Sequence, residues 1–124
     1  MTLKQIDLPV FVFAGYSGSG KTQLIRALIP LCSAAGFRPG IIKHAHHRLQ
    51  LDTPGKDSYR FRDAGAPQVL VASSQRWALL TESPHQQEPE LDTLLQHLDL
   101  KALDVILVEG FKHWPGPKLE VHRT

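Results

Sequence analysis

The chain has 124 residues, a net charge of +2 and 42% hydrophobic residues, which predicts a single domain (1–124) with a real core. Basic and acidic residues are interleaved, and without a basic stripe a nucleic-acid polymer is not an expected partner. The single cysteine, Cys32, excludes an internal disulfide, and no apolar stretch approaches the roughly 18 residues of a membrane span. Because the start also lacks a signal-peptide core, we expect a cytoplasmic protein without membrane contact.

The first predicted element is a buried parallel strand at residues 10–14, which is apolar throughout. Residues 15–22 follow it directly and match the phosphate-binding pattern G-x-x-x-x-G-K-[ST] at every fixed position. Glycines let successive backbone N–H groups turn toward phosphate oxygens, Lys21 adds a positive charge, and the Thr22 hydroxyl suits Mg²⁺. The loop therefore predicts a nucleotide phosphate site, with Lys21 also a candidate catalytic residue. The predicted phosphate-binding residues are Gly15, Tyr16, Ser17, Gly18, Ser19, Gly20, Lys21 and Thr22.

An amphipathic helix begins at Lys21 and is expected to end at residues 34–36, where Gly36 suits a left-handed cap. Pro30 lies inside it and predicts a kink rather than two helices. The predicted apolar face consists of Leu24, Leu28, Leu31 and Cys32, with Ile25 and Ile29 beside it.

Residues 38–44 predict a second strand that completes a right-handed βαβ unit. Ligands gather beyond the carboxyl ends of strands in open α/β sheets, so Lys43 and His44 are expected at the rim that carries the glycine-rich loop, as further candidate nucleotide-binding residues. His46 and His47 follow at the same rim. Two interpretations remain open for the histidines: a polar loop near the phosphates, or a transition-metal site.

A short helix is expected through Arg62 or Ala64, with Asp57 or Ser58 as its cap and a stop at Gly65. Asp57 either caps this helix or reaches Mg²⁺ or an attacking water. In the second role Asp57 is a candidate catalytic residue. Residues 68–72 and 77–81 predict two strands joined by a turn too short for a parallel connection, hence an antiparallel hairpin. Such a hairpin would add an edge to the sheet and favour self-association.

A leucine stripe at 91, 94, 95 and 98 predicts a core-facing helix, and residues 104–110 predict a second buried strand. If that strand runs parallel to the first, Glu109 lies at the phosphate rim and Asp104 at the opposite end. Glu109 and Thr22 are therefore the predicted Mg²⁺ residues. With a final strand at 118–123, the predicted fold class is α/β: three-layer and P-loop NTPase-like, a mostly parallel sheet with an antiparallel hairpin at one edge.

With these segments assembled, the sequence resembles the MobB family of molybdopterin-guanine dinucleotide biosynthesis. The resemblance implies a homodimeric adapter protein that binds GTP and Mg²⁺, hydrolyses GTP slowly at most, and assists a MobA-type guanylyltransferase acting on Mo-molybdopterin. The segments that carry the resemblance are residues 15–22, 42–47, 54–60, 64–66, 72–78 and 107–112.

The sequence contains no asparagine and no Asn/Thr-Lys-x-Asp motif for reading guanine, so guanine preference comes from the resemblance alone. The absence of this motif leaves open whether a C-terminal base-recognition segment is missing. A small-molecule kinase that uses the same loop, with His44, Arg60 or Arg62 holding the acceptor, is the alternative function.

Overall fold

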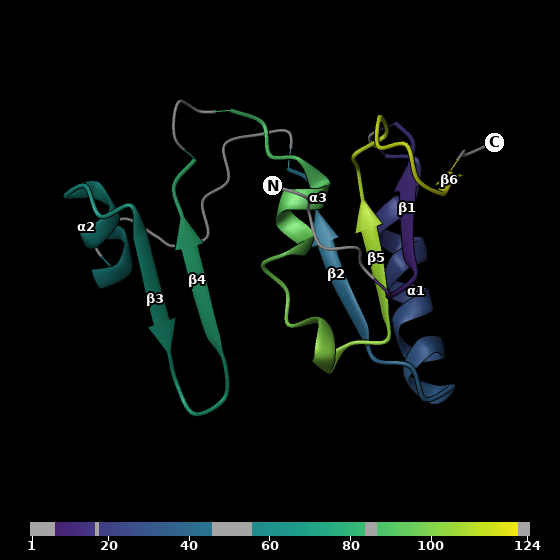
Figure 1. Cartoon of the computed structure of the whole chain (residues 1–124), viewed down its shortest axis with the longest axis horizontal. Coiled ribbons are helices and arrows are strands. Elements are labelled where there is room, and N and C mark those ends of the chain that lie inside the picture. The colour runs from purple at the N-terminus through teal and green to yellow at the C-terminus, as the bar shows by residue number, and fades with distance from the viewer. Residues whose placement is uncertain (1–6, 17, 46–55, 84–86, 122–124) are drawn as a thin grey trace. The chain divides into compact units, whose positions relative to one another are not determined.

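The computed structural model of the chain describes residues 7–16, 18–45, 56–83 and 87–121 (Figure 1). The chain forms two compact units, one from Met1–His46 with Glu90–Thr124 and the other from His47–Pro89. The single-domain assignment of residues 1–124 stays a prediction. The elements of the first unit are β1 (Val10–Ala14), α1 (Lys21–Ala34), β2 (Pro39–Lys43), α3 (Leu91–Leu95), the 3₁₀ helix η2 (Leu100–Ala102), β5 (Val105–Glu109) and β6 (Lys118–Glu120).

The first unit is built on a four-stranded sheet with the order β2-β5-β1-β6, in which every pairing is parallel. The two continuous apolar segments, β1 and β5, lie side by side in the middle, as expected for strands covered on both faces. In their register Phe13 pairs with Glu109, so both strands end at the same edge. Strand β6 joins the outer side of β1, a pairing that the sequence did not predict.

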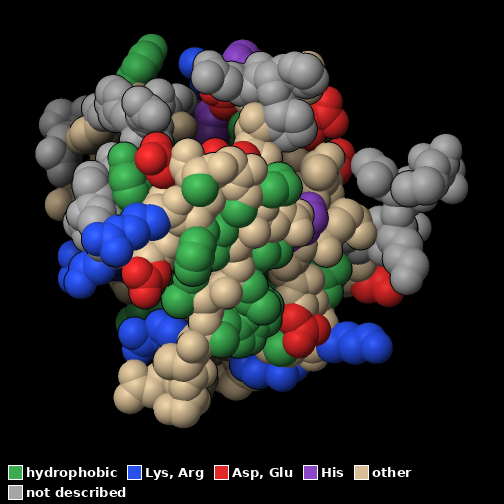
Figure 2. Space-filling view, turned by 90° about the vertical axis from the view of Figure 1, so that its left-hand side faces the viewer, with side chains coloured by type: hydrophobic (Ala, Val, Ile, Leu, Met, Phe, Trp, Pro, Cys, Tyr) green, Lys and Arg blue, Asp and Glu red, His purple; other side chains and the backbone are tan. Residues whose placement is uncertain are grey.

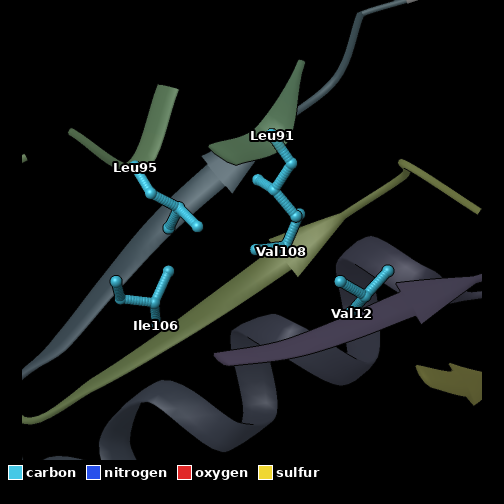
Figure 3. Close-up of a cluster of buried hydrophobic side chains, with 5 residues drawn as sticks. All are labelled: Val12, Leu91, Leu95, Ile106 and Val108. Atoms are coloured by element: carbon cyan, nitrogen blue, oxygen red, sulfur yellow. The ribbon is translucent and has the colours of Figure 1, made fainter. Parts of the chain in front are cut away.

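Alternate residues of β1 and β5 face two separate helices, which makes the first unit a three-layer arrangement. On one face Val12, Ile106 and Val108 pack against Leu91 and Leu95 of α3 (Figure 3). The other face packs on α1, in a cluster that consists of Phe13, Ile25, Val105 and Leu107. Each buried aliphatic side chain contributes about 1.5–3 kcal/mol, so the two clusters fix the sheet between its helices.

Helix α1 buries a different face from the one predicted. Ile25 is buried and the partly buried Leu28, Ile29 and Cys32 follow at i+3, i+4 and i+7, whereas Leu31 is 64% exposed. Leu24 is also exposed, so the prediction that Leu24 and Leu31 belong to the core face was wrong. Apolar residues surround much of this helix, and the sheet selects the stripe with the better i, i+3, i+4, i+7 spacing.

The ends of α1 agree with the sequence. The helix continues through Pro30 to Ala34, and Gly36 adopts the left-handed conformation with φ of 86°. Beyond it the Phe37 amide donates to the Cys32 carbonyl at 2.9 Å, so the chain after Gly36 bonds back to the last turn of the helix. A kink at Pro30 stays a prediction.

The second unit contains α2 (Asp57–Asp63), β3 (Gln68–Ala72) and β4 (Trp77–Thr81). The predicted antiparallel hairpin is confirmed, with Leu70 opposite Leu79 and the Ser73 amide bonded to the Arg76 carbonyl at 2.9 Å. It forms a separate two-stranded sheet, however, and not an edge of the four-stranded sheet. Strands β3 and β4 hydrogen-bond to each other, and α2 packs against β3, so the hairpin is held within its own unit.

The two faces of the hairpin differ in burial. Val69 and Leu80, which are paired, are partly buried, whereas Leu70, Leu79 and Trp77 on the other face are exposed, Trp77 by 67%. Hydrophobic side chains also gather at the centre of the surface seen in Figure 2.

In the part of the chain that the structure describes, no helix has the length and apolar character needed to cross a bilayer.

Candidate phosphate-binding site

The glycine-rich loop connects the end of β1 to the start of α1 and depends on backbone conformations that favour glycine. Gly18 and Gly20 have φ of 81° and 102°, and Gly20 is the residue that precedes α1. At Gly15 a Cβ atom would lie only 2.5 Å from the Val121 carbonyl oxygen. The Val121 amide donates to the Ala14 carbonyl at 2.7 Å, so the chain after β6 braces the loop where it leaves β1.

The N-terminus of α1 opens onto this loop and carries no side-chain cap and no acidic residue in its first turn. Its first backbone N–H groups and the helix dipole therefore favour an anion. Lys21 Nζ donates to the Gly15 carbonyl oxygen at 2.8 Å, which folds the lysine back over the loop. A cationic side chain and an uncapped helix start therefore lie at one loop, as a phosphate site requires.

Glu109 ends β5 beside this loop. Thr22 Oγ1, in the first turn of α1, donates to Glu109 Oε1 at 2.5 Å. Lys43 ends β2 opposite Glu109 in the register, and its Nζ lies 3.6 Å from Glu109 Oε2. The structure therefore brings together Lys21, Thr22, Lys43 and Glu109, four of the residues that the sequence placed at this rim.

Asp104 lies at the other end of β5, as predicted. It accepts from the Arg38 backbone amide at 2.8 Å and from Arg38 Nε at 3.0 Å. The hydrogen bonds from the Arg38 side chain and backbone, with its positive charge, hold the pKa of Asp104 below its usual range. Asp104 therefore ties the starts of β2 and β5 together and takes no part in the phosphate rim.

The residues present suit a magnesium-bound phosphate group. Mg²⁺ prefers oxygen ligands from carboxylates and hydroxyls, and the Thr22 hydroxyl and the Glu109 carboxylate meet at one point. Ser19 Oγ, inside the loop, is buried with no hydrogen-bond partner among the described residues. A buried hydroxyl without a partner costs about 1–3 kcal/mol, which leaves the loop with unused capacity for a polar ligand.

His44 has a role that the sequence did not predict. Its amide donates to the Glu109 carbonyl oxygen at 2.9 Å, and its ring lies 4.8 Å from that of Phe111. Gly110 and Phe111 both have positive φ, 105° and 56°, and a Cβ at Gly110 would lie 2.8 Å from the His44 Cβ. The glycine after Glu109 was a visible signal of this close approach, but no local pattern marks Phe111.

Asp57 lies in the second unit as the first residue of α2. The residue that precedes the helix is Lys56, and α2 has no side-chain cap, so the prediction that Asp57 caps the helix was wrong. Asp57 Oδ1 lies 3.9 Å from Nη1 of Arg60, one turn further along the helix. The negative charge of Asp57 also suits the start of a helix. Its catalytic role stays a prediction.

Three predicted residues, Ser17, His46 and His47, lie outside the described residues. Within the described ranges no group of three or more His, Cys, Asp or Glu side chains could hold a metal. The metal interpretation of the histidines stays open, because two of them are not among the described residues.

A parallel sheet, a G-x-x-x-x-G-K-T loop between β1 and α1, and an acid at the end of the adjacent strand define a P-loop NTPase-like α/β fold. The chain belongs to the MobB family, because the family model for molybdopterin guanine dinucleotide synthesis protein B matches residues 10–124.

Two relatives from bacteria support this assignment. The chain is 53% identical over 116 residues to a molybdopterin-guanine dinucleotide biosynthesis adapter protein of Escherichia coli, covering 94% of this chain and 66% of the relative. The protein of that description from Haemophilus influenzae is 47% identical over 117 residues, with 94% and 65% covered. The chain thus spans just under two thirds of the length of both relatives.

Solved structures agree with the fold. The crystal structure of Bacillus subtilis MobB superposes with a TM-score of 0.76 at 30% identity, covering 92% of this chain and 68% of that chain. A MobB homologue from Bacillus stearothermophilus superposes with a TM-score of 0.69 at 27% identity, covering 93% of this chain and 64% of that chain.

Proposed function

We propose that this chain is a GTP-binding adapter protein that assists the guanylyltransferase step in which Mo-molybdopterin becomes molybdopterin-guanine dinucleotide. The observation that carries the nucleotide part is the convergence of Lys21, Thr22 and Glu109 at one sheet edge. The pathway comes from the relatives, whose names place them as adapters in molybdopterin-guanine dinucleotide biosynthesis.

Each residue of the site has a distinct task in this proposal. The backbone N–H groups of residues 18–22 bind the phosphate oxygens, and Lys21 exchanges the Gly15 carbonyl for the β- and γ-phosphates. Thr22 and Glu109 hold Mg²⁺, which neutralises phosphate charge when bound. As an adapter, the protein is in this proposal at most a slow GTPase.

The partners in this proposal are a MobA-type guanylyltransferase and a second copy of the chain, in the cytoplasm. A two-stranded hairpin is marginally stable unless another strand or surface covers it. The hairpin packs against α2 through β3 and exposes Leu70, Leu79 and Trp77 on one face. Pairing with the same face of a second copy would bury these side chains in a self-complementary contact.

Titration of the purified protein with GTP and with ATP, each with and without Mg²⁺, tests the proposal. GTP is expected to bind more tightly than ATP, and Mg²⁺ is expected to strengthen binding. Equal or tighter ATP binding would remove the guanine assignment. Rapid phosphate transfer to a metabolite would favour the kinase, although Arg62, one of its proposed acceptor residues, is paired with Glu82 at 3.1 Å.

A further inference from the structure

Lys43 stands in an unusual place for a nucleotide-binding lysine, because its partner in the structure is an acid. It ends β2 directly opposite Glu109, with Nζ 3.6 Å from Oε2, while the other carboxylate oxygen accepts from Thr22. The Glu109 side chain is 12% exposed and that of Lys43 is 61% exposed. A largely buried carboxylate is therefore neutralised by a flexible cation that reaches it from the solvent side.

This pairing bears on how an anion binds next to Glu109. A buried carboxylate with no counter-ion would repel a triphosphate in the adjacent loop, and burial strengthens that repulsion. Lys21 is bonded to the Gly15 carbonyl, and among the described residues the cation paired with Glu109 is Lys43. A lysine suits this task because it is a point charge on a flexible stem and can leave when a stronger cation arrives.

We propose that Lys43 is a built-in counter-ion that stands in for the divalent cation at Glu109, and so sets how strongly triphosphate binding depends on Mg²⁺. The inference rests on the proposed function, since it concerns nucleotide binding at that site. Lys43 is then a positioning residue, which acts on the triphosphate through the charge of Glu109. When Mg²⁺ takes its place at Glu109, the lysine is no longer needed.

The variant Lys43→Met keeps the length of the stem and removes the charge. Without Mg²⁺, in EDTA, its affinity for a fluorescent GTP analogue is expected to fall about fivefold, the effect of a pair with one exposed partner. With saturating Mg²⁺ the affinity is expected to match the wild type, because the metal then neutralises Glu109. Lys101→Met is the matched control, since it removes the same charge from η2, at the start of β5.

Two further outcomes would overturn the proposal. A loss of the same size with and without Mg²⁺ would mean that Lys43 contacts the triphosphate directly. No loss in either condition would mean that the pair is a solvated contact without consequence.

In a Glu109→Gln background, Lys43→Met is expected to have no effect in EDTA, because there is no carboxylate charge left to neutralise.

Manganese alone separates this inference from the proposed function. Without nucleotide, Lys43→Met is expected to bind Mn²⁺ about fivefold more tightly than the wild type, because the competing cation is gone. Affinity that does not change, or no binding to either protein, overturns the counter-ion role. A wild type that ignores GTP with and without Mg²⁺ refutes the proposed function, and the manganese comparison still decides the role of Lys43.

Discussion

Lys21 is the cationic side chain of the glycine-rich loop. Its ammonium group donates to the Gly15 carbonyl at 2.8 Å, which holds the positive charge at the loop. We expect Lys21→Ala to weaken binding of a triphosphate by at least about 3 kcal/mol, because a charge-assisted contact in a partly dry site is lost. Isothermal titration of GTP with Mg²⁺ measures this, and Lys101→Ala controls for the change in net charge. Affinity unchanged in Lys21→Ala would contradict the phosphate role.

Asp104 provides a second prediction, on pH dependence. Hydrogen bonds from the Arg38 side chain and backbone hold its pKa below the usual range. A carboxyl whose pKa is lower in the folded state stabilises the fold above its unfolded pKa of about 3.9, and that stability is lost as pH falls through the folded pKa. We therefore expect Asp104→Asn to lower the free energy of unfolding at neutral pH, and the difference from the wild type to shrink in acid. Urea unfolding across this range measures it, and a constant difference would contradict the ion-pair explanation.

Helix α3 is only one short turn of chain, yet it closes one face of the sheet. Leu95 is 1% exposed against Ile106 and Val108, whereas Leu31 on α1 is 64% exposed. We expect Leu95→Ala to cost about 2–5 kcal/mol of unfolding free energy, because a cavity opens between helix and sheet. Leu31→Ala, the same change on an exposed helix face, is expected to alter stability by less than about 0.5 kcal/mol. Chemical denaturation compares the two, and equal losses would contradict the assigned helix faces.

The same elements show what the sequence could predict. Local patterns predict the apolar strands β1 and β5 and the glycines at 15, 18 and 20, and strand polarity places Asp104 and Glu109 at opposite ends of β5. The parallel register confirms the strands, and the Thr22–Glu109 hydrogen bond confirms the end at which Glu109 lies. The three glycines have the expected positive φ. The buried stripe of α1 was not predictable in full, because apolar residues surround the helix and only the sheet selects among them.

Long-range contacts account for the other differences. Local sequence predicts that β3 pairs with β4, but not that the pair forms a two-stranded sheet of its own. Nor does it show that the Val121 carbonyl approaches Gly15, or that Phe111 adopts positive φ beside His44. Each depends on segments that are distant in sequence, where neither periodicity nor a motif carries information.

At the scale of the whole molecule, the exposed hairpin face determines the expected oligomeric state. Leu79 pairs with Leu70 across the hairpin, on the face away from the partly buried Val69 and Leu80. We expect a dimer in light scattering, and Leu79→Lys is expected to raise its dissociation constant at least tenfold, about 1.4 kcal/mol, because charges would meet in the contact. Leu31→Lys places the same charge on an exposed apolar residue of α1 and is expected to leave the dimer intact. A wild-type protein that is monomeric at high concentration, or equal effects of both lysines, would contradict association through this face.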